Sequence, residues 1–412
     1  MKSLEVRMQL DSDALRPVGI LAEKSRRIYF EYDADFIRSG LWLSPFKVPL
    51  KAGLHEHKDI NFGPVFGLFD DSLPDGWGLL LMDRFFRQKG ISPENVSVLD
   101  RLSYIGSHAM GALTYHPAMS KDESATEQFI NLHNMAGQAY QVMTGDVGDL
   151  LPLLLRAGGS PGGARPKVLI GVKDEQMISG EGDLPEGYGH WLVKFFSAKE
   201  CCDEGRVEFA YSKMAKAAGI QMSDTRLFLT NEGDAFFGVE RFDRKKNQRF
   251  HIHSFGNMIH SNFRIPSCDY EMFLRVTRIL TKNHSDVVAA FRMMVFNILA
   301  FNRDDHVKNF SYIMDHTGGW HLAPAYDLTF AAGPGGEHSM TVAGEGRTPR
   351  REHLFTLAEG AGLERRHVLS ILEEVMESVA GWRQYALDSG VGKQRLQAIK
   401  QRIEEAMKGL GP

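Results

Sequence analysis

The chain has 412 residues, enough for two or three domains, and its 43% hydrophobic and 24% charged residues are typical of a globular protein. Its net charge of −4 excludes an electrostatic footprint for nucleic acid over the whole chain. The three cysteines exclude a disulfide framework and a zinc-ligand spacing, because Cys201 and Cys202 are adjacent and Cys268 stands alone.

These cysteines fit a reducing, cytoplasmic location. No membrane contact is expected, because the N-terminus lacks the apolar core of a signal peptide. The longest apolar run, 293–301, contains Asn297 and is too short to span a bilayer.

The first hundred or so residues predict short strands, turns and two helices. Residues 27–36 alternate weakly and are rich in Tyr, Phe and Ile, which favours a strand. After a turn at 72–76, apolar residues recur at helical spacing over 77–87. A second helix is expected after Pro93, and residues 110–115 predict a closing strand.

The remainder predicts a β-rich part followed by a helical part. A polar stretch at 117–135 predicts a domain junction, and 136–155 predicts a helix. Residues 167–240 read as strand, loop, strand, helix, strand and strand. From Tyr270 onward the chain is expected to be mainly helical, with a glycine-rich interruption at 333–346. Three parts are predicted: an N-terminal subdomain over 1–118, a β-rich lobe over 136–245 and a helical lobe over 246–412.

The strongest chemical signal is Asn-Arg-Asp-Asp-His-Val-Lys-Asn at 302–309. Phosphoryl transfer needs a carboxylate that orients the attacking hydroxyl and an oxygen ligand for Mg²⁺ nearby. Protein kinases place both on one loop at D-x-x-x-x-N spacing, which Asp304 and Asn309 match. Asp305 competes with Asp304, although its spacing to Asn309 is one residue short. A polar loop that only caps two helices would give the same octapeptide about as often.

The second signal is Asp327, eighteen residues beyond Asn309 and expected at the end of a strand. A hard Mg²⁺ ion prefers carboxylate oxygens, and kinases place one such aspartate after the catalytic loop. An aspartate at a strand end is otherwise a common turn residue. Its value here comes from its place after the first motif.

The third signal is the glycine-rich segment 158–167, which precedes a strand. Its glycines allow backbone amides to approach phosphate oxygens, as in the loop that covers the nucleotide in kinases. It is not a Walker A loop, because no Gly-Lys-Ser/Thr follows. Such a segment is also often a plain flexible turn. Ser160 lies within it and is a candidate phosphorylation site.

The fourth signal is Lys194, which lies inside an apolar strand and must find an anion there. In kinases this anion is the α/β-phosphate together with a helix glutamate, for which Glu208 is the candidate. We therefore expect the ammonium group to point toward Asp327. A lysine on an edge strand that reaches solvent is the plain alternative. Residues 237–244 then resemble a kinase hinge, although any strand end could give that pattern.

These signals occur in kinase order along one chain, and agreement in both order and type is far less frequent by chance than any single match. The chain also resembles the HipA-like kinases, the toxin components of bacterial toxin–antitoxin pairs. Six stretches carry this resemblance: LPDGWGLLLMDR at 73–84, GGARPK at 162–167, HWLVKF at 190–195, VERFDR at 239–244, NRDDHVKNFS at 302–311 and APAYDL at 323–328.

The resemblance implies an α+β, protein-kinase-like fold with two lobes, an additional N-terminal α/β subdomain and a mainly helical C-terminal lobe. It implies Mg²⁺- and ATP-dependent phosphorylation of serine or threonine in a protein substrate. It also implies a small DNA-binding antitoxin, HipB-like, as the partner through which DNA is contacted. The family's usual target class, an aminoacyl-tRNA synthetase, is only weakly implied.

Carried onto matching positions, the resemblance makes Asp304 the catalytic aspartate and Asn309 and Asp327 the metal ligands. It makes Lys194 the residue that holds the α/β-phosphates. Ser160 matches the family's autophosphorylated loop serine, whose phosphorylation ejects the loop and inactivates the enzyme. The other ATP-binding positions that it implies are Ser160 itself, Gly162, Gly163, Ala164, Glu240, Phe242 and His306.

Two departures from the family pattern stand out. Pro161 follows Ser160 and stiffens the loop, because proline fixes φ and restricts the residue before it. The long glycine-rich segment 333–350 favours a protein-substrate site that differs from that of the better-known family members.

Phosphorylation of Ser160 is expected to move the glycine-rich loop out of the cleft. Arg165 and Lys167 are then expected to pair with the phosphate on Ser160.

Two other functions are compatible with the sequence. A kinase-fold phosphotransferase that acts on a small molecule or lipid uses the same set of a catalytic Asp and metal-binding Asn and Asp residues. A non-catalytic nucleotide-binding regulator is disfavoured by the intact set of Lys194, Asp304, Asn309 and Asp327.

Overall fold

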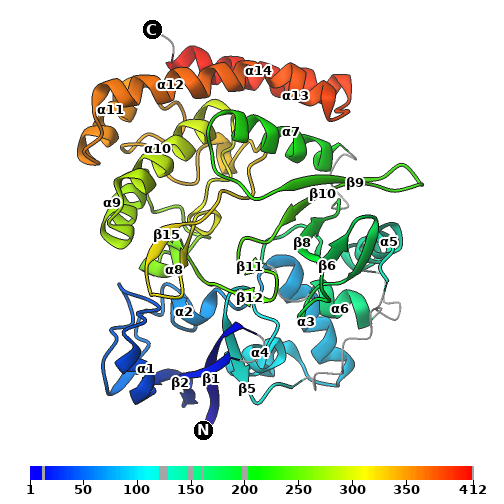
Figure 1. Ribbon diagram of the computed structural model, residues 1–412, viewed down its shortest axis with the longest axis vertical. Helices are drawn as coiled ribbons and strands as arrows, with labels where there is room; N and C mark the ends of the chain where they lie inside the picture. The colour runs from blue at the N-terminus through cyan, green and yellow to red at the C-terminus, as the bar shows by residue number, and fades with distance from the viewer. Residues whose placement is uncertain (12–13, 120–128, 146–151, 159–161, 197–202, 411–412) are drawn as a thin grey trace.

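The computed structural model describes residues 1–11, 14–119, 129–145, 152–158, 162–196 and 203–410 (Figure 1). The N-terminal sheet lies at one end of the molecule and the C-terminal helices at the other, with a second sheet beside the middle. None of the described helices is both long and apolar enough to cross a bilayer.

The N-terminal subdomain is built on an antiparallel sheet with strand order β4-β3-β2-β1-β5. Alternation along β3 puts Ile28, Phe30 and Tyr32 on its buried face. The strands are β1 (Lys2–Asp11), β2 (Ala14–Lys24), β3 (Arg27–Tyr32), β4 (Leu54–Glu56) and β5 (Leu113–His116). The helices are α1 (Ala34–Ser39), α2 (Gly67–Asp70), α3 (Gly76–Gln88), α4 (Val98–Ile105) and the 3₁₀ turn η1 (Pro93–Asn95).

The strand predicted over 27–36 ends earlier than expected, at Tyr32. The side chain of Asp33 accepts hydrogen bonds from the backbone N–H groups of Asp35 at 2.8 Å and Phe36 at 3.2 Å. This N-cap starts α1, so the aromatic residue at 36 is buried from a helix rather than from a strand.

The small lobe contains a second antiparallel sheet, with order β7-β6-β8-β10-β9, and the helix α7 between β8 and β9. Its strands are β6 (Lys167–Lys173), β7 (Gln176–Ser179), β8 (Gly189–Lys194), β9 (Thr225–Leu229) and β10 (Ala235–Glu240). Its helices are α5 (Leu132–Thr144), α6 (Pro152–Gly158) and α7 (Glu204–Ala217). The single helix predicted over 136–155 is thus two helices, α5 and α6.

The core of the small lobe includes side chains from α3, a helix of the N-terminal subdomain. Trp77 and Leu81 of α3 belong to the same buried cluster as Val168, Ile170 and Phe236 of the second sheet. The N-terminal subdomain is therefore packed into the small lobe rather than tethered to it.

The helical lobe follows β10 and carries a small sheet of order β13-β14-β15 beside its helices. Its helices are α8 (Phe255–Ile259), α9 (Tyr270–Thr281), α10 (His284–Leu299), α11 (Arg351–Gly360), α12 (Arg365–Ala380), α13 (Trp382–Asp388) and α14 (Lys393–Leu410), with 3₁₀ turns η2 (Val307–Asn309) and η3 (Pro334–Gly336). Its strands are β11 (Arg244–Lys245), β12 (Gln248–Arg249), β13 (His251–Ser254), β14 (Ser311–Met314) and β15 (Trp320–Leu322). The residue boundaries predicted for the three parts, 1–118, 136–245 and 246–412, stay predictions.

Candidate active site

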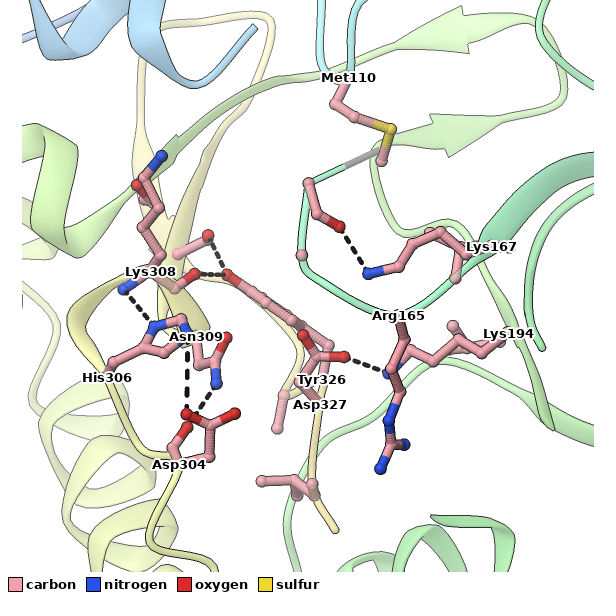
Figure 2. A pocket seen from close by; sticks show the side chains of 18 of the residues that line it. Met110, Arg165, Lys167, Lys194, Asp304, His306, Lys308, Asn309, Tyr326 and Asp327 are labelled. Atoms are coloured by element: carbon pink, nitrogen blue, oxygen red, sulfur yellow. Dashed lines mark hydrogen bonds and ion pairs between the residues drawn. The ribbon is translucent and has the colours of Figure 1, made fainter. Parts of the chain in front are cut away.

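A cavity of about 730 Å³ lies where the N-terminal subdomain, the small lobe and the helical lobe meet. Figure 2 shows two groups of side chains on either side of Asp327: Asp304, His306 and Asn309 on one side, and Arg165, Lys167 and Lys194 on the other. The described residues of the predicted site all line this cavity: Gly162, Gly163, Ala164, Lys194, Glu240, Phe242, Asp304, His306, Asn309 and Asp327. Ser160 lies outside the described residues.

The loop 302–309 follows α10 and is held by buried amides. Asn297, in the last turn of α10, accepts a hydrogen bond from the side chain of Asn302 at 3.0 Å. At the other end of the loop, the Asn309 side-chain N–H donates to the backbone carbonyl of Asp304 at 2.6 Å. Because this bond uses Nδ2, Oδ1 is the atom of the Asn309 side chain that could bind a cation. The D-x-x-x-x-N spacing thus produces a closed loop with both side chains at the cavity.

The environments of Asp304 and Asp305 decide between the two candidate aspartates. The side chain of Asp304 is 60% exposed and lines the cavity. Asp305 is buried, accepts a hydrogen bond from the Tyr270 hydroxyl at 2.7 Å and one from the Ser339 N–H at 2.8 Å, and lies 2.8 Å from Nδ1 of His338. Asp305 therefore holds the loop in place, and Asp304 is the carboxylate that a ligand can reach.

The pKa of Asp304 is raised above its usual value, chiefly because the cavity walls desolvate the carboxylate. The imidazole of His306, 4.0 Å away, opposes this rise, whereas the carboxylates of Asp327 and Asp305 add to it. Water still reaches the exposed side chain, which limits the change. A raised pKa makes Asp304 a better proton acceptor for a hydroxyl.

Lys194 ends strand β8 and joins the two lobes through carboxylates. Its ammonium group donates to Glu208, in the second turn of α7, and to Asp327 in the helical lobe. Burial alone would lower the pKa of Lys194, but the two carboxylates outweigh it and the pKa is raised. The ammonium group points toward Asp327, as the sequence predicted, and the alternative of a solvent-facing lysine is excluded.

Asp327 was expected at the end of a strand, but it lies in a loop five residues beyond β15. Its φ of +54° is in the left-handed region, which non-glycine residues rarely adopt. Burial opposes ionisation of Asp327, yet Lys194 and Lys167 hold its pKa well below the usual range. The carboxylate is therefore charged at neutral pH.

The described part of the glycine-rich loop, residues 162–165, precedes β6 and lines the cavity. Gly163 has a φ of +95°, which favours glycine. The side chain of Lys167 donates to the backbone carbonyl of Gly162 at 2.6 Å and so stabilises the turn. Gly162, Gly163 and Ala164 of this turn line the cavity. Arg165 and Lys167, which follow them, lie across Asp327 from Asp304 and Asn309 (Figure 2).

The predicted hinge, Glu240 to Phe242, connects β10 to the helical lobe and lines the cavity. Phe242 stacks on Tyr326, with ring centroids 5.7 Å apart. The neighbouring charges are buried rather than exposed: Asp243 accepts hydrogen bonds from the guanidinium groups of Arg241 and Arg244 at 2.7 Å each. These ion pairs fix the connection between the lobes.

Comparison with known protein families shows which family the chain belongs to. A family model described as the HipA-like C-terminal domain matches residues 159–382, and the HipA N-terminal domain model matches residues 13–116. The chain belongs to the HipA family.

A HipA structure resembles this HipA-family chain over nearly its whole length. It comes from the HipA, HipB and operator DNA complex of Shewanella oneidensis, with 18% identity, a TM-score of 0.72 and coverage of 99% of this chain and 97% of that one. At this identity the likeness shows the fold. The predicted α+β fold, with kinase-like lobes and an added N-terminal subdomain, is confirmed.

Two curated relatives carry the name "Putative kinase". The relative from Sinorhizobium fredii, Y4dM, is 27% identical over 76% of this chain and 74% of its own length. The relative from Haemophilus influenzae is 27% identical over 49% of this chain and 62% of its own length.

Sequence reasoning missed the position of two basic residues in this HipA-family site. Lys167 and Arg165 were expected only as partners of a phosphate on Ser160 after the loop leaves the cleft, whereas in this structure both line the cavity. Lys167 is buried, and this burial lowers its pKa. Arg165 is 3.3 Å from both Glu204 and Glu208 of α7. Their expected role as partners of a phosphate on Ser160, once the loop has left the cleft, stays a prediction. The signal available in the sequence was the place of Lys167 directly before the apolar run VLIGV, where a lysine must find a partner for its charge.

The donor atoms fit Mg²⁺. The Asp327 carboxylate and the Asn309 amide oxygen are hard oxygen ligands in one cavity, which Mg²⁺ prefers. Together with Lys167 and Lys194, they make a cavity that combines cationic groups for phosphates with oxygen ligands for a cation.

Proposed function

We propose that this HipA-family protein is an ATP-dependent protein serine/threonine kinase. The observation that carries the proposal is the arrangement of Lys194: its ammonium group pairs with both Glu208 and Asp327, in a cavity that also contains Asp304 and Asn309. Active kinases need the lysine–glutamate ion pair and the metal-binding aspartate in place together. The kinase names of the two relatives support the same chemistry.

In the proposed reaction, Asp304 orients a serine or threonine hydroxyl and accepts its proton. The hydroxyl oxygen bonds to the γ-phosphorus of ATP as the bond from that phosphorus to the bridging oxygen breaks, and ADP leaves. Lys194 and Lys167 hold the phosphate oxygens, and glycine-loop amides other than that of Gly163, which donates to Asp75, add hydrogen bonds. Asn309 and Asp327 would hold Mg²⁺, which neutralises charge on the phosphates when it is bound.

The hinge would hold the adenine ring. Glu240 ends β10 and Phe242 follows on the cavity wall, and His306 lines the same cavity beside Asp304. Burial, followed by the charge of Asp224, raises the pKa of Glu240. Backbone groups of a strand that leads from one lobe to the other are suited to an adenine edge.

The partner belongs to the same proposal. HipA of Shewanella oneidensis was solved with HipB and operator DNA. We propose that a HipB-like antitoxin binds this protein and contacts DNA on its behalf, which fits the net charge of −4. The cytoplasmic location is part of this proposal.

Mg²⁺-dependent ADP release by the purified protein, with and without cell extract, tests the function. We expect turnover that Asp304→Asn abolishes, and phosphoserine or phosphothreonine in the products by mass spectrometry. Phosphate found only on a small molecule or lipid would favour the other phosphotransferase class. ATP binding without turnover in every mixture would favour a regulator.

A further inference from the structure

The segment from α2 to the start of α3 reaches the cavity from the N-terminal subdomain. It carries three aspartates, each of which contacts residues of the other lobes. Asp71 lies 2.6 Å from Nδ1 of His253 and accepts a hydrogen bond from the Asn257 side chain at 2.7 Å. Asp70 accepts a hydrogen bond from the ammonium group of Lys308 at 2.9 Å. The third aspartate, Asp75, faces the glycine-rich loop.

Asp75 contacts the part of the loop that faces the cavity. Its Oδ1 atom accepts a hydrogen bond from the backbone N–H of Gly163. In return, the backbone N–H of Trp77 donates to the carbonyl of Gly163 at 3.0 Å. Gly76 has a φ of +44°, and a Cβ there would lie 2.6 Å from the Cα of Ala164. The start of α3 is thus fitted directly against the glycine-rich loop.

Helix capping does not explain this aspartate. Asp75 is the N-cap residue of α3, where an aspartate usually accepts a hydrogen bond from the helix's own amides. Its side chain makes no such bond. The carboxylate instead turns away from its helix toward Gly163.

The other carboxylate oxygen of Asp75 faces the catalytic loop. Its Oδ2 atom lies 3.8 Å from Nζ of Lys308, the residue before Asn309. Lys308 is nearly buried and also pairs with Asp70. One side chain of the N-terminal subdomain therefore lies between the two loops that face each other across the cavity.

We infer that Asp75 is a positioning residue through which the N-terminal subdomain sets the glycine-rich loop relative to the catalytic loop. The Gly163 amide is fixed by Oδ1, and Lys308 is drawn toward Oδ2. The effect on catalysis rests on the proposed kinase function, because it is the phosphates and the attacking hydroxyl that require fixed geometry. The effect on loop order does not depend on that function.

Three full-length variants test the inference. Asp75→Ala removes both contacts, and Asp75→Asn keeps an oxygen that can accept from Gly163 but loses the charge that faces Lys308. Asp83→Asn is the matched control. Asp83 lies on α3, the helix that Asp75 precedes, and its carboxylate is 2.7 Å from the guanidinium group of Arg101. Asp83 does not line the cavity.

Amide hydrogen exchange of 162–167 in the nucleotide-free protein and steady-state kinetics are the two measurements. For Asp75→Ala we expect faster exchange in this loop and a KM for Mg-ATP raised on the order of tenfold, about 1.4 kcal/mol. Asp75→Asn should restore slow exchange and most of the KM but keep a lowered kcat. Asp83→Asn should match the wild type.

Wild-type exchange and KM in Asp75→Ala would overturn the inference, and so would equal effects of Asp75→Ala and Asp83→Asn. If the wild type shows no turnover with Mg-ATP, the proposed kinase function is contradicted, but the inference about loop order is not. The exchange of the loop still decides whether Asp75 holds it.

Discussion

Lys194 and Asp327 form an ion pair between the small lobe and the helical lobe, although 133 residues separate them in sequence. Lys194 is 9% exposed, so its charge depends on partners rather than on water. Glu208 supplies the second carboxylate from α7. This arrangement brings helix α7, strand β8 and the loop that carries Asp327 together at one ammonium group.

The first prediction separates the two neighbouring aspartates. Asp304→Asn should lower the rate of phosphoryl transfer by a factor of about 10² or more and change the melting temperature little, because the side chain is exposed and catalytic bases contribute about 10²–10⁴. Asp305→Asn should instead destabilise the fold, since it puts an amide N–H₂ among the groups that now donate to a buried carboxylate.

Kinetics and thermal unfolding of both variants check this prediction. An active Asp304→Asn protein, or an Asp305→Asn protein that keeps its melting temperature but loses all activity, would reverse the assignment of the two residues.

The second prediction concerns phosphate binding. Lys194→Ala should raise the KM for Mg-ATP at least on the order of tenfold, because loss of a buried charged hydrogen-bond partner costs about 1.5–3 kcal/mol. The variant also removes the cation that Glu208 and Asp327 share, so its melting temperature should fall. Lys216→Ala is the control, since Lys216 lies on α7 and pairs with the exposed Asp224. Equal ATP kinetics in the two variants would contradict the role of Lys194.

Local spacing made part of this site predictable. Asp304 and Asn309 lie on one loop, so their distance in sequence fixes their closeness in space. The pairing of Lys194 with Glu208 follows from a strand that leads into the next helix. In both cases a short stretch of chain carries the geometry.

The approach of Lys194 to Asp327 was predicted from the order of the motifs, but contacts between distant segments that no motif links were beyond the reach of a single sequence. Lys308 and Asp70 are 238 residues apart, and nothing in either motif indicates that they meet. The choice between Asp304 and Asp305 likewise depended on Tyr270, which lies 35 residues before Asp305. Sequence patterns predict which residues could react, whereas the packing of separate elements decides which of them face the cavity.

The third prediction is a pH dependence of stability that comes from Asp243. Burial would raise the pKa of this carboxyl, but Arg241 and Arg244 outweigh it and hold the pKa well below the usual 3.8. A depressed pKa contributes stability that is present above the unfolded-state pKa and is lost as the pH falls toward the folded-state pKa. Asp243→Asn should therefore be less stable than the wild type by about 3–5 kcal/mol at pH 7.

The difference should narrow as the pH falls below about 4, where the unfolded wild type becomes protonated. Thermal unfolding at a series of pH values measures it. Asp224→Asn is a control because this carboxylate is 81% exposed. A gap between the wild type and Asp243→Asn that stays constant with pH would show that the charge of Asp243 is not its source.

The fourth prediction is that Ser160 is a regulatory phosphorylation site. Ser160 lies outside the described residues, but Gly162 and Gly163, which follow it closely, line the cavity. A phosphate adds about two negative charges and three acceptor oxygens. Near this cavity it would be repelled by Asp75 and Asp327 and would compete with ATP for the buried lysines. We therefore expect phosphorylation to release the loop and to weaken ATP binding.

Transfer between molecules is expected, because a residue of the loop proposed to cover ATP would be poorly placed to receive phosphate from that same ATP. An inactive Asp304→Asn protein mixed with active Ser160→Ala protein and Mg-ATP tests this directly by mass spectrometry. Phosphate on Ser160 of the inactive protein is the expected result, and the phosphorylated form should bind ATP more weakly than the unmodified form. An active Ser160→Ala protein that leaves Ser160 of its partner unmodified, or an unchanged ATP affinity after modification, would show that Ser160 does not regulate this protein.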